Sequence, residues 1–399
     1  MLPKGWKHVR LGNIAQITSG GTPDRSEPCY WGEDIPWVTT GEIQFNTITD
    51  TLEKISHDGL NNSSAKLLPA GTLLMAMYGQ GKTRGQVARL GIEAATNQAC
   101  AAICVEDNVD AEFVFQFLAA NYNAIRELGN AGTQQNLNAG LIKGIDLVLP
   151  PRHEQIRIAK IASVWEAVIA VSEKLLANSR RQKEALSQIL DWGGTRLNSR
   201  RGKAMRRHAS ELFAPISIRR NENAELLSVT QEQGVIPRRL LDRKVVMPEG
   251  ATDSYKLVEP GDFVISLRSF EGGLEYSKFR GLVSPAYTVL RAKQPICDDF
   301  YRHYFKSKDF ISRLSVAVIG IRDGKQISYD DFAFLKLQSP SIEVQQKVAA
   351  VLNEAERELE LLTSHLEALK AEKRALMADL LSGKRRVRVP DSIAEPEAA

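Results

Sequence analysis

Metal-binding and disulfide patterns are missing from this chain of 399 residues. Its four cysteines form no C-x-x-C pair and its six histidines form no H-E-x-x-H motif, so neither structural zinc nor a disulfide framework is expected. Cys100 and Cys104, which flank Ala-Ala-Ile, are interpreted as small buried residues of a strand or helix in a reducing cytoplasm. We therefore predict no metal site.

Long apolar runs are missing too. No stretch approaches the roughly 18 residues that a membrane-spanning helix needs, and the start, Met-Leu-Pro-Lys-Gly-Trp, has no apolar signal-peptide core. We expect a cytoplasmic protein with no membrane partner. Charge is nearly balanced, at 52 Lys+Arg against 48 Asp+Glu, and the length favours two or more domains.

The usual enzyme signatures are also absent. GQGKT (79–83) looks like part of a phosphate loop, but the glycine that this motif requires five residues before Gly-Lys is replaced by Ala76. No dinucleotide fingerprint, Ser-His-Asp set, Cys-His pair or carboxylate pair stands out. We predict no catalytic residue and no cofactor on this chain. The alternative, a nucleotide-dependent enzyme, requires ATP turnover that Lys82→Ala abolishes.

What the sequence does contain is an internal repeat with an offset of 190 residues. The match is clearest where LVLPPRHEQIRIAKI (147–161) lies over LQSPSIEVQQKVAAV (337–351) without a gap. Such a repeat predicts two copies of one unit, each a globular part followed by a long helix. Four residue pairs in these strings are identical: Leu147/Leu337, Pro150/Pro340, Gln155/Gln345 and Ala159/Ala349.

The globular parts, 1–150 and 194–340, carry short β-rich runs separated by Gly, Pro and Asn, with short helical stretches between them. They are predicted to be mixed α/β domains. The stretches 151–193 and 341–385 begin after proline and lack Pro and Gly until Gly193 and Gly383, which predicts two long helices. A flexible tail, 386–399, is expected at the end.

Both helices carry a heptad seam, because apolar residues recur at alternating spacings of four and three. A helix of 40 residues is roughly 60 Å long, and each helix is the natural cover for the other's stripe. A short linker after the first helix implies an antiparallel pair with the globular domains related by a pseudo-twofold axis. The seam comprises Ile158, Trp165, Ile169, Leu176, Leu186, Leu190, Val348, Leu352, Leu359, Leu362, Leu366, Leu369, Leu376 and Leu380.

Polar and basic loops occupy corresponding places in the two copies. MYGQGKTRGQVA (77–88) follows an aliphatic run in the first copy, as SLRSFEGGLEYSKFRG (266–281) does in the second. GTQQNLN (132–138) and IRDGKQIS (321–328) form another pair. Arg, Lys, Gln and Asn match base edges and phosphates, so these loops are candidate nucleic-acid contacts. A solvated turn is the competing interpretation of any single loop.

Clusters of cations support the nucleic-acid interpretation. One cluster is the linker, with Arg196, Arg200, Arg201, Lys203, Arg206 and Arg207 and no acid among them, and others are Arg238-Arg239 and Arg243-Lys244. The run Lys384-Arg385-Arg386 fits a solvated helix end as well as phosphate binding. The candidate DNA-binding residues are Thr40, Gln80, Lys82, Thr83, Arg84, Asn97, Gln134, Gln135, Asn136, Arg238, Arg239, Arg268, Lys278, Arg280, Arg322, Lys325 and Gln326.

These strings, in this order, resemble the DNA-specificity subunit of Type I restriction-modification systems. The resemblance covers nearly the whole chain and rests on LPKGWKHVRLGNIAQITSGGTP, IPWVTTGEI, MYGQGKTRGQVA, TNQACAAI and GTQQNLN, and on EPGDFVISLRSFEGG and RGLVSPAYTVLR in the second half. The second copy departs from the family pattern, because Arg322-Asp323-Gly324-Lys325-Gln326 replaces the Thr-Gln-Gln-Asn-Leu-Asn string.

The resemblance implies two target-recognition domains, each reading one half of a bipartite, asymmetric DNA site, with the helices setting the spacer. It implies a non-catalytic subunit that docks two methyltransferase subunits and motor-endonuclease subunits. S-adenosylmethionine, ATP and Mg²⁺ are expected on those partners. The competing hypothesis is a coiled-coil scaffold whose globular ends bind proteins.

Overall fold

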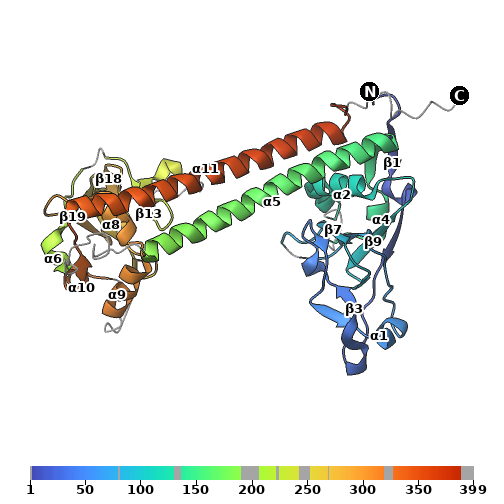
Figure 1. Cartoon of the computed structure of the whole chain (residues 1–399), viewed down its shortest axis with the longest axis horizontal. Helices are drawn as coiled ribbons and strands as arrows, with labels where there is room; N and C mark the ends of the chain where they lie inside the picture. The colour runs from blue at the N-terminus through green and yellow to red at the C-terminus, as the bar shows by residue number, and fades with distance from the viewer. Residues whose placement is uncertain are drawn as a thin grey trace. The chain divides into compact units, whose positions relative to one another are not determined.

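The structure is a computed structural model that describes residues 2–79, 81–129, 136–189, 206–221, 224–241, 252–267, 269–318 and 327–387. It divides into two compact units (Figure 1). Unit 1 comprises Met1–Glu173 and His365–Ala399, and unit 2 comprises Lys174–Ser364. Each long helix therefore contributes one part to each unit. Both units are mixed α/β, which confirms the predicted class of fold.

Unit 1 is built around a five-stranded sheet with the order β2-β9-β6-β7-β4, beside a three-stranded sheet β5-β3-β8 and the pair β1-β10. Its helices are α1 (His57–Asn61), α2 (Ala111–Ala120), α3 (Tyr122–Leu128) and α4 (Ala139–Lys143). Its strands are β1 (Lys7–Arg10), β2 (Ala15–Ser19), β3 (Trp31–Val38), β4 (Thr47–Ile48), β5 (Glu53–Ile55), β6 (Leu73–Ala76), β7 (Val87–Leu90), β8 (Ala95–Thr96), β9 (Cys100–Val105) and β10 (Asp146–Leu149).

The five-stranded sheet of unit 1 is buried on both faces. Side chains alternate along a strand, so Leu73 and Met75 of β6 join the core that contains α2, while Leu74 and Ala76 join a second core on the other face. Helix α2 lies between the sheet and the first part of the long helix α5 (Figure 1). Cys100 is buried in β9, as predicted, but Cys104 of the same strand is half-buried, so the prediction of a buried residue was wrong there.

Unit 2 repeats this framework with a four-stranded sheet, β12-β19-β16-β17, and the pair β11-β20. Its strands are β11 (Arg206–His208), β12 (Phe213–Ile216), β13 (Leu227–Thr230), β14 (Gly234–Pro237), β15 (Lys256–Val258), β16 (Phe263–Ile265), β17 (Glu275–Tyr276), β18 (Gly281–Val283), β19 (Thr288–Ala292) and β20 (Lys336–Gln338). Its helices are α6 (Ala209–Leu212), α7 (Ser269–Gly272), α8 (Asp298–Tyr304), α9 (Lys308–Val318) and α10 (Tyr329–Ala333).

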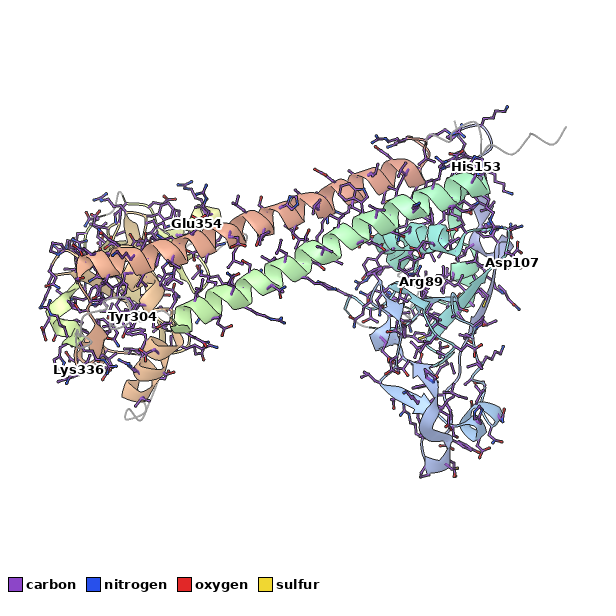
Figure 2. The ribbon with its side chains drawn as sticks, viewed as in Figure 1. Arg89, Asp107, His153, Tyr304, Lys336 and Glu354 are labelled. Carbon is purple, nitrogen blue, oxygen red and sulfur yellow. The ribbon has the colours of Figure 1, made fainter. Side chains whose placement is uncertain are left out.

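The four strands of this sheet follow the order of the first four strands in unit 1, with β12, β19, β16 and β17 in the places of β2, β9, β6 and β7, and β4 has no counterpart in it. The cores differ in composition. Unit 2 packs an aromatic cluster around Phe213, Phe305 and the fully buried Tyr304 (Figure 2). Arg206 and Arg207, which were predicted as linker residues, belong to β11 and pair with β20.

The long helices are α5 (Arg152–Ile189) and α11 (Ile342–Leu381), which confirms the prediction of two long helices. In unit 1, Lys373 and Lys370 of α11 donate to Glu166 and Glu173 of α5, each at 2.9 Å. Within unit 1 the two helices are therefore antiparallel. In unit 2, Lys183 of α5 donates to Glu356 of α11 at 2.8 Å.

Within the described ranges, no helix is long and apolar enough to cross a membrane. The same residues contain no group of three or more His, Cys, Asp or Glu side chains placed to hold a metal ion.

Candidate nucleic-acid interface

The predicted loops of unit 1 meet at the end of the sheet where β6 ends. The N–H of Met77 donates to the carbonyl oxygen of Ala99, just before β9, at 2.8 Å. The carbonyl oxygen of Met77 accepts from the N–H of Leu137 at 3.0 Å. These bonds hold three segments side by side, so the half-buried Asn136 lies next to the loop that follows β6.

Asn97 and Thr40 reach the same end of the unit through β3. The N–H of Asn97 donates to the carbonyl oxygen of Val38, the last residue of β3, at 3.0 Å. Thr40 begins the 3-10 helix η3 (Thr40–Glu42) directly after that strand. Sheet topology therefore brings Thr40, Asn97 and Asn136, which are distant in sequence, onto neighbouring loops.

The loop after β6 is fastened to α3. The hydroxyl of Tyr122 donates to the carbonyl oxygen of Lys82 at 2.5 Å and accepts from Nη1 of Arg126 at 3.1 Å. The first of these bonds is made by the backbone of Lys82 and does not use its side chain. Lys82 is exposed and Thr83 is half-buried, so both are available to a ligand.

Arg84 was predicted to contact DNA, but its side chain lies inside unit 1 and the residue is only 5% exposed. The loop turns back at Gly85, whose φ of +83° suits glycine and whose N–H donates to the carbonyl oxygen of Ala76 at 2.9 Å. The turn directs Arg84 into unit 1. Burial leaves little of its guanidinium for a direct DNA contact, so we retain Lys82 and not Arg84 as the contacting cation of this loop.

Cations gather in unit 2 around the segment that precedes β13. Arg239 pairs with Glu225 at 2.8 Å and Arg280 pairs with Glu259 at 3.1 Å, and both arginines are exposed. Exposed pairs of this kind are weak and exchange readily for phosphate. Atoms Nε and Nη1 of Arg238 are buried without a hydrogen-bond partner, which leaves two charged donors unsatisfied.

Lys278 is exposed on the segment between β17 and β18. It lines a cavity of about 1010 Å³ in unit 2, with Gln231, Lys306, Glu356 and the end of α5 among the other walls. Lys306 pairs there with the buried Glu275 at 2.5 Å, and burial raises the pKa of Glu275. The cavity wall carries both signs of charge, so the position of Lys278 does not mark a purely basic surface.

A polar network joins α8 to both long helices inside unit 2. Arg302 donates to Glu356 at 2.5 Å and to Asn353 at 2.8 Å, and Lys183 completes the network on Glu356. Burial by itself raises the pKa of Glu356, but Lys183 and Arg302 outweigh burial and hold it at about 2. This network fixes α8 of unit 2 on the long helices α5 and α11.

Several predicted residues lie outside the described ranges. In unit 1 these are Gln80, Gln134 and Gln135. In unit 2 they are Arg268, Arg322, Lys325 and Gln326, together with the seam residue Leu190. Their DNA-contact and seam roles stay predictions.

The described seam residues all lie on buried or half-buried positions of α5 and α11. Ile158, Leu176, Val348, Leu352, Leu366 and Leu380 are buried. The half-buried ones are Trp165, Ile169, Leu186, Leu359, Leu362, Leu369 and Leu376. One arginine of the predicted run Lys384-Arg385-Arg386 has a partner in unit 1, because Arg386 pairs with the fully buried Glu154. The Arg386 side chain is therefore paired within the protein, although it is 48% exposed.

Two glutamines that were not predicted as site residues have matching roles. Nε2 of Gln155 donates to the carbonyl oxygen of Pro150 at 2.8 Å, and its Oε1 accepts from the N–H of Asp110 at the start of α2. Gln345 makes the same two bonds in unit 2, to the carbonyl oxygen of Pro340 and from the N–H of Cys297. The sequence signal that could have identified them is that glutamine stands at both positions, 190 residues apart.

Two units of one sheet order, each with polar loops at its surface, define a repeat protein with two separate candidate reading surfaces. Residues 3–178 match the family model described as the Type I restriction modification DNA specificity domain. The resemblance found in the sequence is confirmed over this part of the chain.

Known proteins support the same family. The chain is 24% identical over 193 residues to the Type I restriction enzyme MjaIX specificity subunit of Methanocaldococcus jannaschii, covering 47% of this chain and 42% of that protein. It is 28% identical over 194 residues to the HindI specificity subunit of Haemophilus influenzae, covering 48% and 40%. The matches thus span less than half of these relatives.

The fold also has a counterpart among solved structures. The S subunit of the Type I restriction-modification system from M. genitalium aligns with a TM-score of 0.54 and 15% identity, covering 94% of this chain and 96% of that one. At this identity the likeness concerns the fold alone.

Proposed function

We propose that the chain is the non-catalytic DNA-specificity subunit of a Type I restriction-modification complex in the cytoplasm. Each recognition domain reads one half of a bipartite, asymmetric site. Partner subunits perform adenine methylation and restriction at the sites this chain selects. The chain itself contributes binding energy and register, and the target adenine is flipped out of the duplex by the partners.

One observation carries the proposal. The two units share the sheet order of their frameworks but differ in the loops that follow β6 and β16, where Lys82 and Thr83 have no identical counterparts at the 190-residue offset. Loops on a shared, rigid framework are the part of a protein that can change ligand without changing fold. Two unlike loop sets suit two unlike half-sites.

Local cations support the choice of DNA as the ligand. Lys82 in unit 1 and Arg239 and Arg280 in unit 2 are exposed and suited to phosphates, while Asn97 and Asn136 carry amide groups that match adenine. Arg238 is half-buried, so it adds positive charge near this surface, but its buried Nε and Nη1 atoms make no direct contact with DNA in the proposal. We include Thr40, Thr83 and Lys278 in the proposed contact set.

The helices are proposed to act as the ruler. Two antiparallel helices that hold the domains in a pseudo-twofold arrangement would fix the distance between half-sites about one helical turn, roughly 34 Å, apart. A 38-residue helix such as α5 is roughly 57 Å long at 1.5 Å per residue, which is of the right order.

Partner docking is the remaining part of the proposal. Two methyltransferase subunits, carrying S-adenosylmethionine, and motor-endonuclease subunits, carrying ATP and Mg²⁺, would assemble on this chain. An exposed apolar stripe on α5 in unit 1, formed by Val164, Val168 and Val171, supports a protein partner on this helix. The residues of α11 that correspond to these valines at the 190-residue offset are Glu354, Glu358 and Leu361. Two of the three are acidic, and Glu354 is exposed (Figure 2).

Methylome sequencing tests this function. A host that carries this chain with a methyltransferase partner should methylate one bipartite adenine site throughout its genome. Replacing the loop 77–88 should change one half of that site, and replacing 266–281 should change the other half. Equal changes in both halves would refute separate readers.

A coiled-coil adaptor that binds only proteins is the second candidate, favoured by the same Val164, Val168 and Val171 stripe. A mobility-shift assay with the methyltransferase partner separates the two functions. Sequence-selective binding that weakens steeply with salt supports the specificity subunit. An absence of DNA binding with every partner tested supports the adaptor.

A further inference from the structure

An exposed phenylalanine in unit 1 adopts a backbone conformation that its side chain disfavours. Phe45, between η3 and β4, has a φ of +56° and is 39% exposed. A side chain with a Cβ atom is strained at positive φ, and exposure of a phenyl ring forfeits burial of its apolar surface. Asparagine or glycine would avoid both costs, so neither local conformation nor the core accounts for phenylalanine here.

Hydrogen bonds on both sides impose this conformation. The N–H of Phe45 donates to the carbonyl oxygen of Val87 at 2.8 Å, and the carbonyl oxygen of Asn46 accepts from the N–H of Arg89 at 2.9 Å. Oδ1 of Asn46 also accepts from the N–H of Gln44 at 2.9 Å. The turn is thus tied to β7 at two points, and its strain is maintained by the sheet.

The ring of Phe45 is aimed by the same residue that holds the candidate DNA loop. It packs edge-on against Tyr122, with ring centroids 5.3 Å apart and planes at 88°. The hydroxyl of Tyr122 fixes the carbonyl of Lys82. Phe45, with the exposed Gln44 and Asn46 beside it, therefore lies on the surface that carries Lys82.

We propose that Phe45 is a specificity-determining residue of unit 1, whose exposed ring makes apolar contact with the C5-methyl group of a thymine in the half-site that this unit reads. That methyl group is the apolar feature displayed in the major groove of DNA, and phenylalanine is among the side chains that recognise it. Strain held at an exposed residue is typical of ligand-contacting positions. This inference rests on the proposed function.

The test measures binding of duplexes to the full chain in complex with its methyltransferase. Each thymine of the mapped site is replaced in turn by deoxyuridine, which lacks only the methyl group. We expect one such replacement to weaken wild-type binding about fivefold, and Phe45→Gly to weaken binding of the unmodified site by a similar factor. Combining the two changes should cause no further loss.

Stability separates this role from a structural one. Glycine adopts positive φ without strain, which offsets the loss of the contact with Tyr122, so Phe45→Gly should change the melting temperature little. Phe45→Asn, which tolerates this conformation, should behave in the same way. Phe334→Ala removes a phenyl ring that is 78% exposed in unit 2 and is the matched control, with no expected change in binding or in the response to deoxyuridine.

Three outcomes would overturn the inference. These are a site-selective complex that no deoxyuridine replacement weakens, a deoxyuridine effect that persists in Phe45→Gly, and a Phe45→Gly protein that loses binding only because it melts earlier. A complex with no sequence-selective binding at all would instead refute the proposed function, so the two failures are distinguishable.

Discussion

Unit 1 and unit 2 share a framework and differ in what surrounds it. Both have the same order of four strands in the main sheet, a terminal strand pair and a glutamine that ties the long helix to the recognition part. Unit 1 adds the sheet β5-β3-β8, where unit 2 adds the pairs β13-β14 and β15-β18. The comparison teaches that framework bonds specify the fold and leave the added strands and loops free to diverge.

Over the described ranges, backbone strain is found in the divergent parts of the two units and not in the shared framework. Among the described residues, the non-glycine positions with positive φ are Phe45 and Arg220, one in each unit and both exposed. An aromatic ring stands at one and a cation at the other. The two units therefore place different chemistry at their strained surface positions, which agrees with the proposal that they read unlike half-sites.

The largest effect is expected from lengthening the two long helices, α5 and α11, which contribute to both units. Inserting one heptad after Ser172 in α5 and another after Leu362 in α11, positions 190 residues apart, should keep the helices paired and add roughly 10 Å. The methylated site should then have a spacer about three base pairs longer with both half-sites unchanged. Methylome sequencing measures this, and an unchanged spacer would contradict the ruler.

The glutamine ties should matter equally in both units. Gln155→Ala and Gln345→Ala each remove two hydrogen bonds and leave buried backbone groups unpaired, so each should lower the free energy of unfolding by about 2–4 kcal/mol. Urea denaturation checks this. Gln346→Ala, at an exposed neighbouring position, is the control and should change little. Unequal losses would break the equivalence of the frameworks.

Glu166 of α5 and Glu356 of α11 occupy equivalent positions, 190 residues apart, and their replacement should affect the stability of the two units differently. The pKa of Glu356, about 2 in the folded protein, is below the ordinary value of 4.5, so its stabilisation is present above pH 4.5 and is lost as pH falls towards 2. Glu356→Gln should cost about 1–3 kcal/mol at pH 7, with the difference from wild type shrinking below pH 4.5. Thermal melts across pH measure this.

Glu166→Gln is the matched variant in unit 1. Glu166 is more exposed than Glu356, 43% against 31%, so its pair with Lys373 should contribute about 0–1 kcal/mol. Equal losses for the two variants would show that the Arg302 network adds nothing to unit 2.

The smallest effects are expected from single phosphate contacts. Lys82→Ala and Arg280→Ala should each weaken DNA binding across sequences and lower the slope of log affinity against log salt by about 1. Salt titrations of binding measure the slope. Lys66→Ala, an exposed lysine before β6 and thus towards the other end of that strand, is the control. An unchanged slope in either variant would remove that residue from the interface.

Local periodicity made the framework predictable. The heptad pattern located α5 and α11, and the 190-residue offset identified Gln155 and Gln345 as equivalent, because both signals depend on spacing along the chain. Strand order was not predictable, since pairings such as β6 with β9 join segments with no sequence signal for their partner.

The sequence by itself determined the repeat, the long helices, their apolar seam and the resemblance to a known family, because each depends on the order and spacing of residues. Tertiary structure alone decided that Thr40, Asn97 and Lys82 belong to one end of unit 1. It also decided that Arg84 is buried and that Arg386 pairs with Glu154. The same is true of Phe45, which hydrogen bonds to β7 hold outward. Burial and orientation depend on contacts between distant segments, and composition and spacing do not record them.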